Sequence, residues 1–159
     1  MMKIVGIDPG LAGTGIGVIE GSCRNIRSYS FGSISTEAGE SIPDRLNQIY
    51  SKTKIFLQEQ APDLIVIEDI YSLEKYPGSG IMLGKVSGVL LLAAFKAGAR
   101  VKEVSVREVK KVVSGNGGAD KYQVERSVRH LLNHEGPIRP FHASDALGLA
   151  LTGLYRYGK

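Results

Sequence analysis

Three carboxylates occupy sequence positions where an ordinary fold rarely places an isolated charge. Asp8 follows the apolar run Ile4–Ile7, and Glu68 follows a second apolar run, Leu64–Ile67. Asp145 precedes an apolar helical series and is expected in the first turn of that helix. A buried carboxylate is costly unless it is paired, hydrogen-bonded or bound to a metal. If the two runs are adjacent strands and the helix packs on them, the three carboxylates meet at one place.

Such a cluster has a definite chemistry. Three oxygen donors suit Mg²⁺ or Mn²⁺, and two such ions can activate a water and stabilise the leaving oxygen when a phosphodiester is cleaved. His142 precedes Asp145 by three residues and therefore shares its helix face. His142 can reach the same ions, act as a general acid or base, or stabilise the phosphate. The spacing predicts a metal-dependent nuclease site of Asp8, Glu68, His142 and Asp145.

Each of these residues also has an ordinary explanation. Asp8 can form a turn before a Pro-Gly pair, and Glu68 can end a strand at the surface. Asp145 can stabilise a helix dipole, and His142 can serve near a helix cap. Asp69 points to the opposite side of its strand from Glu68 and is not expected to be a ligand. The joint placement at strand ends and in one late helix is what favours an active site.

The elements that must position these residues follow from apolar periodicity and turn signals. Strands are expected over Lys3–Asp8, Gly13–Glu20, Asn25–Ser35, Leu64–Ile67 and Val101–Val104. Helices are expected around Leu46–Leu57, over Ile81–Ala97, from Ser105 to Val113, from Asp120 to about Asn133, and over His142–Tyr157. Tyr71–Gly80, with two tyrosines, a proline and glycines, is predicted to be a loop.

This order predicts an α/β fold formed by residues 1–159 as a single domain. The first three strands have short connections and should pair antiparallel, whereas the later strands follow helical crossovers and should run parallel. The expected architecture is a mixed five-stranded sheet with helices on both faces.

Composition excludes several classes of protein. The apolar fraction of 43% supports a core, and the charged fraction of 23% is ordinary for a water-soluble domain. The longest apolar stretch, Val86–Ala97, is expected to be too short for a bilayer, and the N-terminus lacks a signal-peptide pattern. Cys23 is the only cysteine, which fits a reducing compartment. We therefore expect a cytoplasmic protein without a membrane partner.

The net charge of +4 is distributed unevenly. Between Arg100 and Arg129 the sequence has eight basic and four acidic residues, a surplus equal to that of the whole chain. A local basic surface is what a phosphate backbone requires, although a solvated helical face has the same composition.

Five segments together resemble the RuvC family of Holliday-junction resolvases, within the RNase H-like superfamily. The resemblance covers approximately Met2 to Tyr155, and the opening motif alone is weak because actin-like ATPases share it. The segments are Ile4–Gly10 with Thr14-Gly15, Val66–Tyr71, Leu83–Lys85 with Gly88, Arg107–Lys121, and His142–Leu147.

The resemblance implies a homodimer that binds four-way DNA junctions and nicks two strands symmetrically, during recombination and DNA repair. It implies Mg²⁺ as cofactor, with two ions per site and Mn²⁺ as a substitute, and the RuvAB branch-migration complex as a partner. Asp8, Glu68 and Asp145 fall on three of the family's catalytic carboxylates. The fourth position, often Asp in the family, is His142, which leaves its role open between metal ligand and proton or phosphate handler.

The resemblance also assigns DNA contacts. Lys110 and Lys121 match basic residues near the scissile phosphate, and Tyr71 falls where an aromatic ring is used against unpaired bases. Each can instead be an ordinary surface or core residue. The apolar helix Ile81–Ala97, with Gly84 and Gly88, fits either a dimer interface or a buried core helix.

Three other functions compete with a junction resolvase. An RNA nuclease on the same fold would cut RNA hairpins rather than junction DNA. A junction-holding protein, disabled because one acidic position is His142, would bind without nicking. An actin-like ATPase would share the Asp8-Pro9-Gly10 turn, but this chain is too short for its two domains.

Overall fold

A mixed sheet organises the molecule, as the order of the strands predicts. The computed structural model describes residues 1–70 and 77–158. Within them, five strands lie in the order β3-β2-β1-β4-β5, with the first two pairings antiparallel and the last two parallel. The strands are β1 (Met2–Asp8), β2 (Gly13–Ser22), β3 (Asn25–Ser35), β4 (Leu64–Glu68) and β5 (Arg100–Val104).

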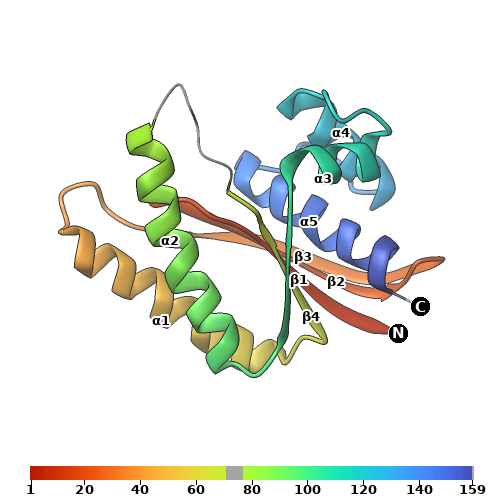
Figure 1. Cartoon of the computed structure of the whole chain (residues 1–159). Helices are drawn as coiled ribbons and strands as arrows, with labels where there is room; N and C mark the ends of the chain where they lie inside the picture. Colours follow the sequence, from red (N-terminus) through yellow and green to blue (C-terminus); the bar gives the residue numbers. More distant parts are fainter. Residues whose placement is uncertain (71–76, 159) are drawn as a thin grey trace.

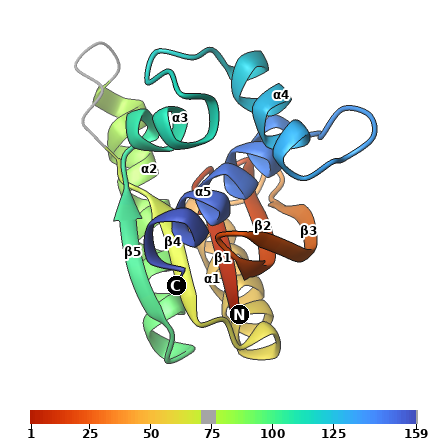
Figure 2. The same ribbon diagram turned by 90° about the vertical axis from the view of Figure 1, so that its right-hand side faces the viewer.

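Helices cover both faces of this sheet, which confirms the predicted fold class (Figures 1 and 2). On one face lie α1 (Ile42–Gln60) and α2 (Pro77–Lys96), which pack against each other. On the other face α5 (Phe141–Tyr157) crosses β1 and β2, and α3 (Val106–Ser114) and α4 (Lys121–Leu131) pack on α5.

The alternation of side chains along the central strands divides the core in two. Ile4 and Val66 face α5 and the helices packed on it, whereas Ile7 and Ile67 face α1 and α2. All four are fully buried. Since both faces of β1 and β4 are covered, these strands are almost continuously apolar. The first strongly polar side chain in each run therefore comes where the strand leaves the core.

Local capping interactions occur at the starts of α1, α3 and α4, and the last two begin where the sequence predicts them. The hydroxyl of Ser41 accepts a hydrogen bond from the backbone N–H of Asp44, and Ser105 does the same for Glu108. Asp120 and Gln123 form a complete capping box at the start of α4. Such caps satisfy backbone N–H groups that the first helical turn leaves without partners. The start of α4 is important here because it places Lys121.

The helix α2 begins earlier than expected, at Pro77 rather than Ile81. The predicted loop Tyr71–Gly80 is therefore wrong over residues 77–80, and its remainder lies outside the described residues. Proline is well tolerated in a first helical turn, and packing against α1 outweighs the weak helix propensity of the glycines. With this earlier start the helix has the length and apolar composition of a membrane span, contrary to expectation. Val86 and Leu90 are nevertheless fully buried in the core of this fold.

The last helix also begins one residue early, at Phe141, after an N-cap at Pro140. Asp145 therefore lies beyond the first turn, which corrects the prediction that it is a first-turn residue. The helix dipole acts mainly on groups in the first turn. Stabilisation of the dipole is thus a weaker explanation for Asp145 than the sequence suggests. The preceding helix, α4, ends at Leu131 instead of near Asn133.

Candidate active site

The parallel pairing of β1 with β4 brings the first two carboxylates together. Ile7 on β1 pairs with Ile67 on β4, so Asp8 and Glu68 follow at the same edge of the sheet. Asp8 is buried, with 6% of its surface exposed, and Glu68 is half-buried. After burial, a hydrogen bond between the two carboxyl groups is the next cause that raises the pKa of Glu68. The adjacency that the sequence requires of these two strands is therefore present.

A close approach of α5 to β2 adds His142 and Asp145 to this edge. A Cβ atom on Gly15 would collide with the backbone carbonyl of His142, and one on Gly17 would lie 2.6 Å from the backbone nitrogen of Leu147. Only glycine allows the helix backbone to rest on the strand in this way. These glycines therefore position the site. The sequence analysis did not predict this role, although the Gly-x-Gly spacing on one face of the strand could have indicated it.

The carboxylates repel one another electrostatically. Burial, the hydrogen bond to Asp8 and the negative charges of Asp8 and Asp145 raise the pKa of Glu68 to about 9. Burial and the charge of Asp8 raise the pKa of Asp145 to about 6. The ammonium of Lys110 lowers both pKa values and so partly offsets these effects. Shifts of this kind mark functional sites when they occur in a cluster.

His142 is joined directly to the carboxylate cluster. Its Nδ1 lies 2.7 Å from Oδ2 of Asp8, and its side chain is half exposed. The hydrogen bond to Asp8 is the main cause that raises the pKa of His142 above 6.5, against the opposing effect of burial. Because Nδ1 binds Asp8, Nε2 is the nitrogen through which His142 can reach a water, a phosphate oxygen or a metal.

The donor set fits divalent cations by its chemistry. In the part of the chain that the structure describes, no three His, Cys, Asp or Glu side chains are arranged so that they could already hold a metal ion. Asp8 is instead engaged with His142 and Glu68, and the raised pKa of Glu68 favours the protonated form of that carboxyl group. A divalent cation would replace this proton, since carboxylate oxygens are its preferred ligands.

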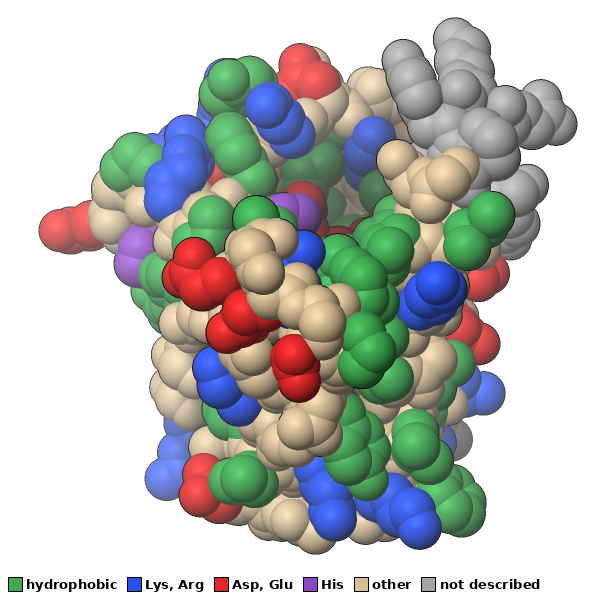
Figure 3. Space-filling model, turned by 90° about the vertical axis from the view of Figure 1, so that its left-hand side faces the viewer, with side chains coloured by type: hydrophobic (Ala, Val, Ile, Leu, Met, Phe, Trp, Pro, Cys, Tyr) green, Lys and Arg blue, Asp and Glu red, His purple; other side chains and the backbone are tan. Residues whose placement is uncertain are grey.

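The predicted DNA contacts differ in position. Lys110 lines a small cavity of about 30 Å³ together with Glu68 and Asp145, so it belongs to the site. Lys121 lies apart from that cavity, with its Nζ 5.0 Å from the ring centre of Phe141, the residue before His142. Tyr71 lies outside the described residues. Figure 3 shows a hollow on one side of the molecule, with acidic, histidine, and lysine or arginine side chains around it.

An aromatic pair beside the site was not predicted. The rings of Tyr122 and Phe141 meet edge to face, with centroids 5.2 Å apart, and Lys121 and Arg139 lie over the ring of Phe141. Each cation–π contact contributes about 0.5–1 kcal/mol at an exposed position. Phe141 thus orders two cations near His142. The sequence signal available for this pair was the aromatic residue Phe141 directly before His142.

Comparisons with known proteins match nearly the whole chain to one family. The family model described as crossover junction endodeoxyribonuclease RuvC matches residues 4–153. A relative of that name from Brevibacillus brevis is 38% identical over 151 residues, which are 95% of this chain and 90% of the relative. Another, from Syntrophomonas wolfei, is 36% identical over 98% of this chain and 90% of its own length. Thermus thermophilus RuvC, solved in complex with a Holliday junction substrate, superposes with a TM-score of 0.87 at 29% identity, covering 98% of this chain and 94% of that one.

Proposed function

The chain belongs to the RuvC family of crossover junction endodeoxyribonucleases and resolves Holliday junctions, and we propose that it does so at the cluster of Asp8, Glu68, Asp145 and His142. We also propose that residues 1–159 form a single nuclease domain. The observation that carries it is the convergence of three carboxylates, where burial and the neighbouring negative charges raise the pKa values of Glu68 and Asp145, with Lys110 beside them. Isolated surface or capping carboxylates would not show this pattern.

The residues divide the chemistry among them. Asp8, Glu68 and Asp145 would hold two Mg²⁺ ions, for which Mn²⁺ can substitute. When bound, such ions supply Lewis-acid stabilisation of the phosphate and a more acidic water. Lys110 binds and orients the scissile phosphate through its ammonium group. His142 has two alternative roles at Nε2: as the protonated imidazole that Asp8 favours, it can donate a proton to the leaving oxygen, and as the neutral imidazole it can bind a metal ion.

A nicking assay tests this function directly. We expect the protein to introduce paired nicks into a synthetic four-way DNA junction in Mg²⁺ or Mn²⁺, and to leave a linear duplex of the same sequence intact. Binding of the junction without any nicking would support a disabled junction-holding protein. Cutting of RNA hairpins in preference to the junction would support an RNA nuclease on the same fold.

The metal preference depends on His142. Imidazole nitrogen is a better ligand for Mn²⁺ than for Mg²⁺, so wild-type protein should nick faster in Mn²⁺. In His142→Asp the site becomes all-oxygen, and the ratio of the Mn²⁺ rate to the Mg²⁺ rate should fall. Single-turnover nicking rates in each ion measure that ratio. An identical ratio in both proteins would remove His142 from the metal shell and leave it the proton role.

Lys110 should contribute to catalysis rather than to folding. Its side chain is half-buried beside the carboxylates, where it offsets their negative charge. We expect Lys110→Ala to slow nicking by about 100-fold, as loss of one positioned charge does, with little change in melting temperature. Lys111→Ala, at an exposed neighbouring position, is the control. A drop in thermal stability as large as that of a core substitution would assign Lys110 a structural role.

The outer face of α2 supports a homodimer. Ile81, Leu92 and Phe95 are exposed by 65%, 48% and 75%, and Gly84 and Gly88 lie on the same stripe with open space before them. Small residues between large apolar ones allow two helices to approach closely, and a two-fold dimer would present two sites to a two-fold junction. On family grounds we also place the protein in the cytoplasm with RuvAB as a partner.

Charge on this stripe should separate the dimer. Leu92→Glu or Phe95→Glu is expected to yield a monomer in sedimentation velocity and to uncouple the two nicks. Ile55→Glu on α1, where the side chain is 56% exposed, is the matched control and should leave the dimer intact. A wild-type protein that sediments as a monomer at micromolar concentration would argue against this interface.

A further inference from the structure

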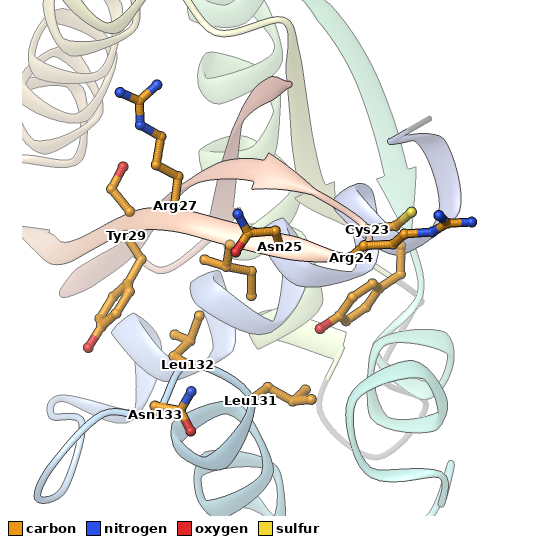
Figure 4. A pocket seen from close by; sticks show the side chains of 11 residues that line it. Cys23, Arg24, Asn25, Arg27, Tyr29, Leu131, Leu132 and Asn133 are labelled. Atoms are coloured by element: carbon orange, nitrogen blue, oxygen red, sulfur yellow. The ribbon is translucent and has the colours of Figure 1, made fainter.

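Two clefts meet around the end of α4, away from the carboxylate cluster. One, of about 600 Å³, lies between the β2–β3 turn and the residues that follow α4 (Figure 4). The other, of about 350 Å³, lies along the outer side of α4. Asn133 lines both, so the two clefts adjoin at this residue, and we call them together the groove. The surface is therefore larger than a single phosphate would need.

The charges along this groove have one sign. Of the described residues that line it, none is Asp or Glu. The charged side chains that line it are Arg24, Arg27, Arg126 and Arg129, and together with His130 and His134 we call them the basic track. In Figure 4 the side chain of Arg24 extends outward beside Cys23, whereas that of Arg27 points to the side of the strand away from Asn133. A surface of this kind attracts a polyanion and releases its counterions on binding.

Side-chain contacts hold the residues between the two clefts in place. The hydroxyl of Tyr29 lies 2.7 Å from Nδ1 of His134, and the His134 ring meets the rings of Tyr29 and Phe31 edge to face. This joins the segment after α4 to the edge strand β3. Beneath the track, buried Glu125 holds Nε of Arg129 at 3.3 Å. The contact partly neutralises Arg129 but also fixes its direction.

The basic track is connected to the active site through α4. That helix begins at Lys121, beside Phe141, and Arg126 and His130 follow on it five and nine residues later. At 1.5 Å per residue they lie about 7 and 14 Å further along the helix. Figures 1 and 2 show α4 on the opposite side of the molecule from α2, the proposed dimer helix. DNA leaving the site along α4 would therefore run outward from the dimer.

We propose that the basic track binds the phosphate backbone of one duplex arm of the junction, beyond the cleavage site. This rests on the proposed function and adds a second contact region to it. The contact is with phosphates and carries no sequence preference, because guanidinium groups on an open surface reach the backbone rather than base edges. Arm contacts of this kind stabilise the complex and set the direction in which the arm leaves it.

Arm length and salt provide the test. The double variant Arg24→Ala/Arg126→Ala removes two exposed charges of the track. In Ca²⁺, we expect it to bind a junction with 20-bp arms roughly tenfold more weakly than wild type at 100 mM salt, and to lower the slope of log K against log salt by about 2. On a junction with 6-bp arms the loss should be clearly smaller. Arg24→Lys/Arg126→Lys should restore the affinity, and equal melting temperatures exclude misfolding.

The control is Lys52→Ala/Lys54→Ala on α1, which removes the same charge from the other face of the sheet. An equal loss for this control, or an equal loss on long and short arms, would overturn the proposal. The proposal would also be overturned if the wild-type protein bound tripolyphosphate in thermal-shift titrations but the track variants kept full affinity for the long-arm junction. Nicking of the short-arm junction by wild type is scored separately, because its failure would reject the proposed function and not the arm contact.

Discussion

Replacement of Asp8, Glu68 or Asp145 by the corresponding amide should lower the rate of junction nicking by on the order of 10³-fold or more and leave junction binding intact. Each amide keeps the shape of the side chain but loses the negative charge that a divalent cation requires. Metal catalysis supplies several kcal/mol of transition-state stabilisation, and each 1.36 kcal/mol is tenfold in rate. Single-turnover nicking and a binding titration in Ca²⁺ measure the two properties separately.

The three variants should not be equivalent in other respects. Asp8 also accepts the hydrogen bond from His142, so Asp8→Asn should additionally return the pKa of His142 toward its ordinary value. Asp69→Asn is the matched control, since it neutralises the carboxylate next to Glu68 in sequence. Full activity of any one site variant would remove that residue from the metal site, and a strong defect in Asp69→Asn would enlarge the site instead.

Glu68→Gln should stabilise the metal-free protein even though it inactivates the enzyme. The pKa of Glu68 is raised from 4.5 to about 9, so the folded state keeps a proton that the unfolded chain releases above pH 4.5. Stability of the wild type must therefore fall as pH rises between 4.5 and about 9. The variant lacks this loss, and at pH 8 we expect its free energy of unfolding to exceed that of wild type by at least about 1 kcal/mol.

Chemical denaturation in EDTA at pH 4.5 and pH 8 measures this difference. It should be small at the lower pH and large at the higher one, and excess Mg²⁺ should reduce it by stabilising only the wild type. Asp145→Asn should behave similarly over the narrower window between pH 3.8 and about 6. The exposed Glu59→Gln serves as the control. Parallel pH profiles of wild type and Glu68→Gln would show that the carboxylates are not strained in the folded state.

Elements with strong local signals were predicted well. The runs before Asp8 and Glu68 are apolar on both faces, which suits only covered central strands, and Asp120 with Gln123 marks a helix start by its own hydrogen bonds. The start of α2 was predicted wrongly, because Pro77 and the following glycines read locally as loop residues, whereas packing of α2 on α1 decides the outcome.

The sequence by itself determined which residues are out of place, namely Asp8, Glu68 and Asp145 at the ends of apolar runs, and the order of elements that carry them. The tertiary structure alone decided that they meet. Their meeting depends on β1 lying beside β4 and on α5 resting directly on Gly15 of β2. Strand neighbours and helix approach are long-range packing choices that local propensity does not encode. For the same reason, the edge-to-face contact of Tyr122 with Phe141 and the groove around Asn133 could be seen only in the folded chain.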